Sequence, residues 1–281
     1  MAATPPPLDP QSTVSVRDIA GGGSVDGARS IRVVTIERPE VRNAVDGPTA
    51  QLLYDAFVQI DRDPSIGAAI LTGAEGTFCA GADLGAVSAG RGNRVGEEPG
   101  DTIVGTLGPM GPTRLDLDTP VIAAVEGYAV AGGLELALWC DLRVAADDAA
   151  FGVFCRRWGV PLIDGGTVRL PRLIGESVAT DLILTGREVA ADEAWRIGLA
   201  NRVVPSGAAL TEAVELARRI VAFPPRCVDS DRRSSRDQHG QSLGEALAHE
   251  VALGMATIRS GETRRGASRF AAGEGRHGAG T

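Results

Sequence analysis

The sequence contains no lysine, so all 28 of its strongly basic residues are arginine. This absence excludes chemistry that needs a lysine, such as Schiff-base formation or phosphate binding by a phosphate-loop lysine. The net charge is −8 and no stripe of basic residues stands out, so we expect no nucleic-acid partner. Arginine is left as the strong side-chain cation for an anionic ligand.

Cysteine, histidine and long apolar runs are also scarce. The four cysteines lie far apart and form no CxxC pair, which indicates free thiols in a reducing, cytoplasmic environment. The three histidines all lie in the last quarter of the chain without the spacing of metal ligands, so we expect no metal. The most apolar stretch, residues 121–140, contains two glutamates and several glycines and is too interrupted to insert into a membrane.

The order of apolar segments predicts an α/β fold. Residues 14–36 read as a hairpin, and buried strands are predicted at 66–73 and near 121–125. Helices are predicted after Asp46 and after residue 131, so strands and helices alternate, which is typical of α/β layers.

The remaining segments are of other kinds. Residues 88–117 are rich in glycine and polar residues and read as a mobile loop with a short helix, which we expect to line a binding pocket. Amphipathic patterns at 208–223 and 241–258 predict two helices near the C-terminus. We therefore expect a disordered tail at 1–13, a core at 14–205, a helical region at 206–272 and a frayed end at 273–281.

Two of the predicted strands run into very small residues, at 80–82 and at 131–133. The first turn of a helix leaves main-chain N–H groups unpaired, and glycine lets a ligand oxygen approach them. If the two turns face each other, two N–H groups converge on one carbonyl oxygen and stabilise negative charge on it. Either stretch taken alone would be read as an ordinary tight turn.

Several segments resemble the crotonase (enoyl-CoA hydratase/isomerase) superfamily, in the order that the family has them. They are residues 38–46, 77–84, 121–146, 150–175 and 183–205, and the pairing of CAGADL with GYAVAGGLELA is specific. The resemblance implies a spiral of ββα units with a C-terminal helical region used for oligomerisation. It also implies homotrimers or dimers of trimers, an acyl-CoA thioester as substrate, and no cofactor beyond the coenzyme A (CoA) of that substrate.

The resemblance also implies roles for individual residues. Ala82 and Gly132 would donate their N–H groups to the thioester oxygen, and Glu135 would be a catalytic carboxylate, although a glutamate in a first helical turn can merely favour the helix dipole. The residues expected to contact CoA or the substrate are Arg42, Ala44, Ala80, Gly81, Asp83, Leu84 and Gly133.

The sequence departs from the family where a second catalytic glutamate is usual, since Cys155 stands at that position. A thiol is a poor substitute for a carboxyl group at neutral pH, and the sequence offers no neighbouring histidine to activate it. Asp164 is a candidate replacement acid, but an aspartate before Gly-Gly-Thr is also a good helix N-cap. Arg156, Arg157 and Trp158 would shape an acyl pocket, bind an acidic acyl group or lie at a subunit contact.

Three functions follow as alternatives. Glu135 and Asp164 acting together predict an enoyl-CoA hydratase that adds water to a trans-2-enoyl-CoA. Glu135 acting alone predicts an enoyl-CoA isomerase or another enolate reaction. Loss of the second glutamate is also compatible with a non-catalytic protein that binds acyl-CoA.

Overall fold

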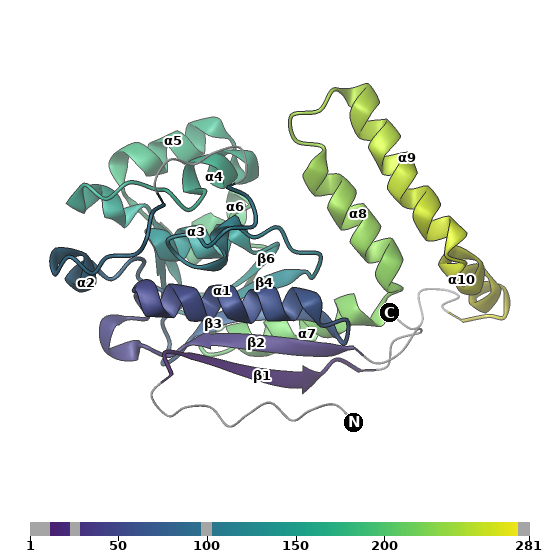
Figure 1. The fold of residues 1–281 in the computed structure, drawn as a ribbon, viewed down its shortest axis with the longest axis horizontal. Coiled ribbons are helices and arrows are strands. Elements are labelled where there is room, and N and C mark those ends of the chain that lie inside the picture. Colours follow the sequence, from purple (N-terminus) through teal and green to yellow (C-terminus); the bar gives the residue numbers. More distant parts are fainter. Residues whose placement is uncertain (1–11, 23–28, 97–102, 275–281) are drawn as a thin grey trace.

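A larger and a smaller β-sheet form the centre of the computed structural model, which describes residues 12–22, 29–96 and 103–274 (Figure 1). In spatial order, the larger sheet consists of β1 (Val14–Ala20), β2 (Ser30–Ile36), β3 (Ile66–Gly73), β4 (Val121–Val125), β6 (Leu142–Ala146) and β9 (Arg202–Val204). The smaller sheet consists of β5 (Tyr128–Val130), β7 (Ala150–Gly152) and β8 (Glu188–Ala190). β1 and β2 pair antiparallel, as the predicted hairpin requires, and the rest of the larger sheet is parallel.

Helices follow the strands in a repeating order. They are α1 (Gly47–Arg62), α2 (Leu84–Ser88), α3 (Gly132–Trp139), α4 (Gly166–Ile174), α5 (Glu176–Thr185), α6 (Ala191–Arg196), α7 (Ala209–Ala222), α8 (Pro225–Asp237), α9 (Leu243–Arg259) and α10 (Glu262–Ala271). One turn of the chain runs β4, β5, α3, and the next runs β6, β7, α4. In the turn before these, an isolated bridge between Cys79 and Ala129 takes the place of the second strand. This is the predicted spiral of ββα units.

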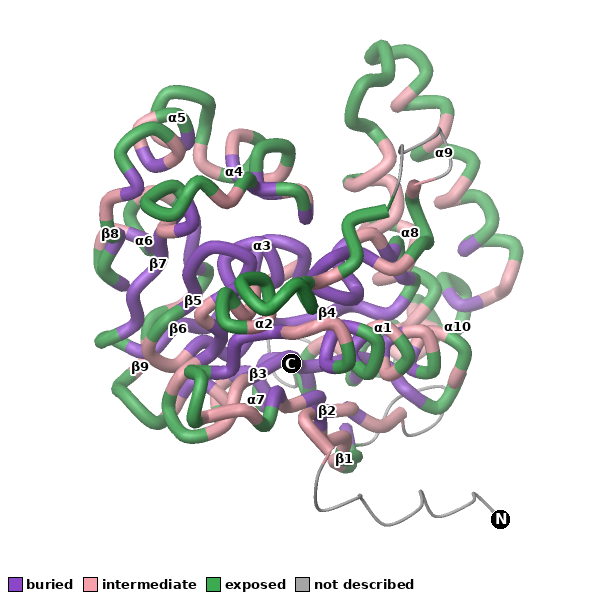
Figure 2. Tube along the Cα trace, turned by 60° about the vertical axis from the view of Figure 1, so that its left-hand side comes forward, coloured by how far each residue is buried: buried purple, intermediate pink, exposed green. Residues whose placement is uncertain are grey.

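The central strands of the larger sheet, β3, β4 and β6, are buried on both faces (Figure 2). In β3, Leu71 packs with α1 and α3 on one face, whereas Ile70 packs with α7 on the other. Parallel strands covered by helices on both sides are apolar without interruption, which explains the run IGAAILTG.

The predicted helix after Asp46 is confirmed as α1. The side chain of Asp46 accepts a hydrogen bond from the Thr49 N–H at 3.0 Å, and Pro48 lies in the first turn, where its missing N–H costs nothing. Phe57 of α1 is fully buried and meets the ring of Trp139 edge-on, with the centroids 4.8 Å apart. This contact joins α1 to α3, the helix that carries Glu135.

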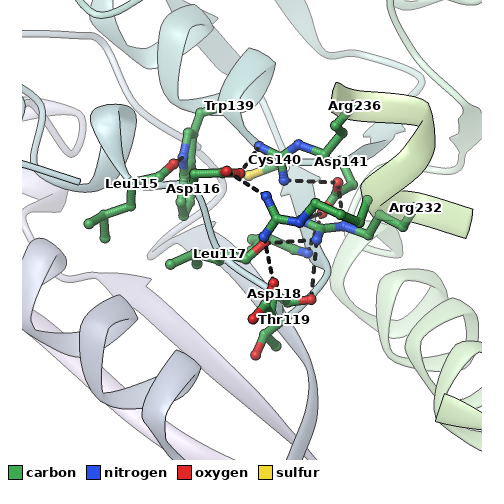
Figure 3. A network of polar contacts seen from close by, with 12 residues as sticks. Leu115, Asp116, Leu117, Asp118, Thr119, Trp139, Cys140, Asp141, Arg232 and Arg236 are labelled. Carbon is green, nitrogen blue, oxygen red and sulfur yellow. Dashed lines mark hydrogen bonds and ion pairs between the residues drawn. The ribbon is translucent and has the colours of Figure 1, made fainter. Parts of the chain in front are cut away.

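The C-terminal helices differ in how they contact the rest of the chain. α7 and α9 confirm the two predicted amphipathic helices within one or two residues, whereas the sequence analysis did not predict α8. Arginines hold α8 against the core: Arg232 binds both carboxylate oxygens of Asp141 and also the Leu117 carbonyl oxygen (Figure 3). α9 packs along α8 and stands away from the sheets (Figure 1).

Within the described ranges, no helix combines the length and the apolar composition needed to span a bilayer. The predicted tails fall largely on residues 1–11 and 275–281, which lie outside the described part of the chain.

Asn43 fixes the segment that precedes α1. Its side chain is fully buried, accepts a hydrogen bond from the Arg38 N–H, and donates to the carbonyl oxygens of Ala74 and Thr77. The residue also has a φ of 55°, in the left-handed region that asparagine tolerates better than most residues.

We expect Asn43→Ala to lower the free energy of unfolding by about 2–4 kcal/mol, because several buried polar groups lose their partner at once. Urea denaturation measures the change. Gln51→Ala is the matched control, since that amide is exposed on α1 and bonds only Asp55, and it should change stability by less than about 0.5 kcal/mol. Equal losses of unfolding free energy in the two variants would contradict the structural role given to the Asn43 side chain.

Candidate active site

The two turns of small residues lie against each other. Cys79 bridges to Ala129, and the Cys79 N–H donates to the Tyr128 carbonyl oxygen at 2.8 Å. Gly81 has a φ of +101°, and a Cβ placed on it would lie 2.9 Å from the Gly132 nitrogen. The contact therefore requires a glycine at 81 both for its backbone conformation and for the space.

The N–H groups of Ala82 and Gly132 both lack a partner among the described residues. The Val45 N–H donates to the Gly81 carbonyl oxygen, and the Asp83 N–H donates to the Val45 carbonyl oxygen. This pairing leaves the Ala82 N–H unused. Gly132 is the first residue of α3, where an N–H has no partner within its own helix. Across the described residues, neither group donates a hydrogen bond to the protein.

Gly133 sets how closely α3 approaches the other turn. A Cβ on Gly133 would lie 2.0 Å from the Cys79 carbonyl oxygen, which is far inside van der Waals contact. Any side chain at this position would push α3 away and separate the two unbonded N–H groups. The structure thus gives Gly133 a packing role next to the site.

Glu135 lies in the first turn of α3 and is 2% exposed. Its Oε1 accepts hydrogen bonds from the N–H groups of Asp164, at 2.9 Å, and Gly166, at 2.8 Å. No hydrogen bond reaches Oε2 from any described residue, so this oxygen is available to a substrate or a water molecule.

The carboxyl group of Glu135 has a pKa raised to about 7. Burial is the main cause, and the negative charge of Asp164 adds to it, while the two N–H donors act in the opposite direction. Burial also raises the pKa of Asp164. A carboxyl group that titrates near neutrality can both take up and release a proton under ordinary conditions.

The interpretation of Asp164 as an N-cap is wrong. α4 begins after Gly165 and has no side-chain cap. Instead, Asp164 is 3% exposed and its Oδ1 accepts hydrogen bonds from the Met110 N–H, at 3.0 Å, and the Thr113 hydroxyl. The side chain turns toward the segment 108–113, and only the main chain of Asp164 bonds to Glu135.

Three residues of this site were missed at the level of sequence. Met110 covers the start of α3, since a Cβ on Gly132 would lie 2.6 Å from its sulfur. Thr113 holds Asp164, and Arg169 ties the two segments together by donating to the carbonyl oxygens of Asp164 and Thr113. One feature of the sequence could have indicated these residues. Two Gly-Pro pairs flank Met110, and such pairs are typical of a defined turn within a loop.

The other predicted residues lie around the first turn. Asp83 caps α2 and forms an ion pair with Arg38 at 2.9 Å, so its carboxylate is occupied by the protein. Arg42 is exposed, places its guanidinium over the Tyr128 ring at 5.6 Å, and accepts a hydrogen bond from the Ala80 N–H through its carbonyl oxygen. Ala44 is buried beside this segment, and Leu84 is exposed at the start of α2.

Cys155 is buried close to Glu135. Burial raises the pKa of its thiol, and the charge of Glu135 raises it further. The side chain therefore stays protonated at neutral pH and offers no charge to the site. Arg156 and Arg157 point elsewhere and donate to the carbonyl oxygens of Ile183 and Gly186.

Comparison with known proteins agrees with this arrangement. The family model for enoyl-CoA hydratase/isomerase matches residues 26–276. The chain is 39% identical over 246 residues to the enoyl-CoA hydratase EchA19 of Mycobacterium tuberculosis, covering 85% of this chain and 89% of that one. It is also 39% identical over 233 residues to a carnitinyl-CoA dehydratase of Salmonella arizonae, covering 82% and 83%. A crystal structure of an enoyl-CoA hydratase from M. tuberculosis superposes with a TM-score of 0.81 at 37% identity, covering 92% and 95%.

The raised pKa of Glu135 predicts a pH-dependent cost to stability. The folded protein holds this proton up to about pH 7, whereas the unfolded chain loses it near the ordinary glutamate pKa of 4.5. The ionised carboxylate therefore lowers the free energy of unfolding. This loss is absent below about pH 4.5 and complete above about pH 7, where it reaches roughly 3 kcal/mol. Glu135→Gln, which keeps the acceptor oxygen without the charge, should therefore stabilise the protein at about pH 8 but not near pH 4.5.

Urea denaturation at the two pH values checks this expectation. Glu188→Gln removes a charge from an exposed position on β8 and is the control. The raised pKa of Glu135 would be contradicted if the free energies of unfolding of wild type and Glu135→Gln differed by the same amount at both pH values.

Proposed function

The chain belongs to the enoyl-CoA hydratase/isomerase family, and we propose that it adds water across the double bond of a trans-2-enoyl-CoA. The observation that carries this proposal is the position of Glu135, a buried carboxyl group with one free oxygen, beside two unbonded main-chain N–H groups.

In this proposal the N–H groups of Ala82 and Gly132 bind the thioester oxygen. Water attacks the β-carbon, and the electron pair of the double bond moves so that an enolate forms with its charge on that oxygen. Fixed donors that face a developing oxyanion are typically worth about 3–4 kcal/mol each. The enolate then collapses when a proton reaches the α-carbon, and the carbonyl group is restored.

Glu135 carries the protons in this scheme. Its Oε2 accepts a proton from the attacking water and returns a proton to the α-carbon, so the net change is the addition of H and OH. A single carboxyl group suffices for both transfers because its pKa lies near 7. The dehydration of a 3-hydroxyacyl-CoA is the same sequence of steps in reverse.

Asp164 has a supporting part in the proposal. Its Oδ1 is already bound by Met110 and Thr113, which argues against a direct proton transfer from that oxygen. Its charge raises the pKa of Glu135, and its N–H orients the Glu135 carboxylate. Asp164 is therefore a positioning residue in this scheme. If Asp164 transferred a proton itself, it would have to use its other oxygen, Oδ2.

We also propose that copies of the chain assemble, as homotrimers or dimers of trimers. The support is an exposed apolar row on α9, spaced at three or four residues and so on one face of the helix. The row consists of Leu243, Leu247, Val251, Met255 and Ile258. A contiguous apolar face of this kind is typical of a contact between proteins.

We expect Glu135→Gln to lower kcat for the hydration of crotonyl-CoA by about 10²–10⁴-fold, because the proton carrier is lost while the binding groups remain. Loss of the enoyl thioester absorbance measures the rate. In the wild type, kcat/KM should rise with pH through about 7, as Glu135 must be ionised to act as the base. Cys155→Ala is the control in the same site and should stay within about tenfold of wild type. Wild-type protein that binds CoA thioesters but turns over none of them would contradict the proposal.

Asp164→Asn distinguishes its two possible parts. The variant keeps an acceptor for Met110 and Thr113 but removes the charge beside Glu135. If Asp164 is a positioning residue, the variant should keep kcat within about tenfold of wild type and move the rise of kcat/KM to lower pH. A loss of kcat as large as that of Glu135→Gln, with no such shift, would make Asp164 the second proton-transfer residue.

A further inference from the structure

A cavity of about 890 Å³ lies behind the catalytic carboxylate, between α3, α4 and α8. Thr113 and Asp164 form its wall next to the site, and the Asp164 N–H donates to Glu135 Oε1 at 2.9 Å. The residues expected to contact CoA do not line it. A substrate that extends from Glu135 past Asp164 would place its acyl group, and not its CoA, in this cavity.

Part of the cavity wall is apolar, with Leu115, Leu138, Trp139, Leu162 and Val168 among its residues. This surface suits a chain of methylene groups. The rest of the wall is charged, which is unusual for a space that only receives a hydrocarbon tail.

The acidic residues of the cavity are mostly paired with other side chains. Asp116 and Asp141 form ion pairs with arginines of α8 (Figure 3). Asp237 binds His249 at 2.9 Å. Asp164 is bound by Met110 and Thr113, as described above. The carboxylates are thus already engaged within the protein.

The arginines of the cavity are not paired in this way. Arg114, Arg143 and Arg169 donate to main-chain carbonyl oxygens, which leave the positive charge in place. Arg172 is an exposed residue of α4 that lines the cavity, and its side chain makes no hydrogen bond with any described residue. Among the ion pairs of the described chain, none involves these four arginines, and only Arg236 of the cavity arginines has acidic partners.

We propose that the preferred substrate is an enoyl-CoA whose acyl group ends in a carboxylate, and that this carboxylate binds in the cavity with Arg172 as its main partner. This inference rests on the proposed function. The carboxylate would complete the pairing of the cavity charges, since the guanidinium of Arg172 can bind both of its oxygens. An acyl group that ends in a cation, as the carnitinyl group does, would meet the unpaired guanidiniums instead.

The test compares trans-2-enoyl-CoA substrates of equal chain length that end in a methyl group or in a carboxylate, over a series of lengths. At the best length, wild-type protein should show a kcat/KM at least about tenfold higher for the carboxylate, the effect of one charge-assisted hydrogen bond. The preference should fall as salt is added, because part of the cavity is open to solvent. Crotonyl-CoA is assayed in parallel.

Arg172→Gln should reduce this preference to within about threefold of unity, since it removes the charge and keeps a long polar side chain. Arg219→Gln is the matched control, because Arg219 is an exposed arginine of α7 that lies outside the cavity and whose side chain makes no hydrogen bond with any described residue. This control should keep the full preference.

The outcomes separate this inference from the proposed function. Hydration of crotonyl-CoA without a preference for the terminal carboxylate would overturn the inference and leave the hydratase intact. A preference that survives in Arg172→Gln, or a preference for a cationic acyl end, would also overturn it. No turnover of any enoyl-CoA would overturn the proposed function itself.

Discussion

The site depends on how the Glu135 carboxylate is held inside the protein. Two main-chain N–H groups, of Asp164 and Gly166, bind the same oxygen and leave the other one free. A side chain at Gly166 would displace the carboxylate from this position, because a Cβ there would lie 2.9 Å from Oε1. Burying the carboxylate next to Asp164 destabilises its charged form, and the same destabilisation brings its pKa to the range in which proton transfer is useful. Stability at neutral pH and reactivity are therefore opposed at this residue.

The ββα spiral explains why distant parts of the sequence meet at this carboxylate. Each turn of the chain adds a segment to the smaller sheet, at Cys79, β5 and β7, and each segment then leaves the sheet at the same edge. The turns at 80–82 and 131–133 are thus equivalent positions in successive repeats, and the segment after β7, which contains Cys155, is the next one. The residues that follow these segments therefore lie side by side in neighbouring repeats. One repeat supplies the unbonded N–H of Ala82, and the next supplies both Gly132 and Glu135.

The sequence predicted those parts of the fold that local patterns determine. The strand IGAAILTG, the Asp46 cap and the two glycine-containing turns each carry a signal within a few residues. Asp164 was ambiguous because its position before Gly-Gly-Thr suits a cap, and only the tertiary approach of Met110 and Thr113 directs its side chain elsewhere. α8 was not predicted because it contains few apolar residues and so shows no apolar stripe; arginines fix it to the core. Contacts between residues more than 50 positions apart, such as Thr113 with Asp164, leave no trace in local spacing.

The arginines of α8 also determine the charge of the cavity behind the site. Arg232 binds both oxygens of Asp141 with its planar fork and still reaches the Leu117 carbonyl oxygen, which the compact ammonium of a lysine would not do with the same geometry. α8 forms ion pairs with the acids on its side, whereas Arg114, Arg143, Arg169 and Arg172 form none with a described residue, although the charges of Arg114 and Arg169 still act on Asp164. In the proposed scheme, a helix that takes no part in the proton transfers therefore influences the charge that an acyl group would meet. In a chain without lysine, one residue type both fastens the helical region to the core and supplies the strong cations of the cavity wall.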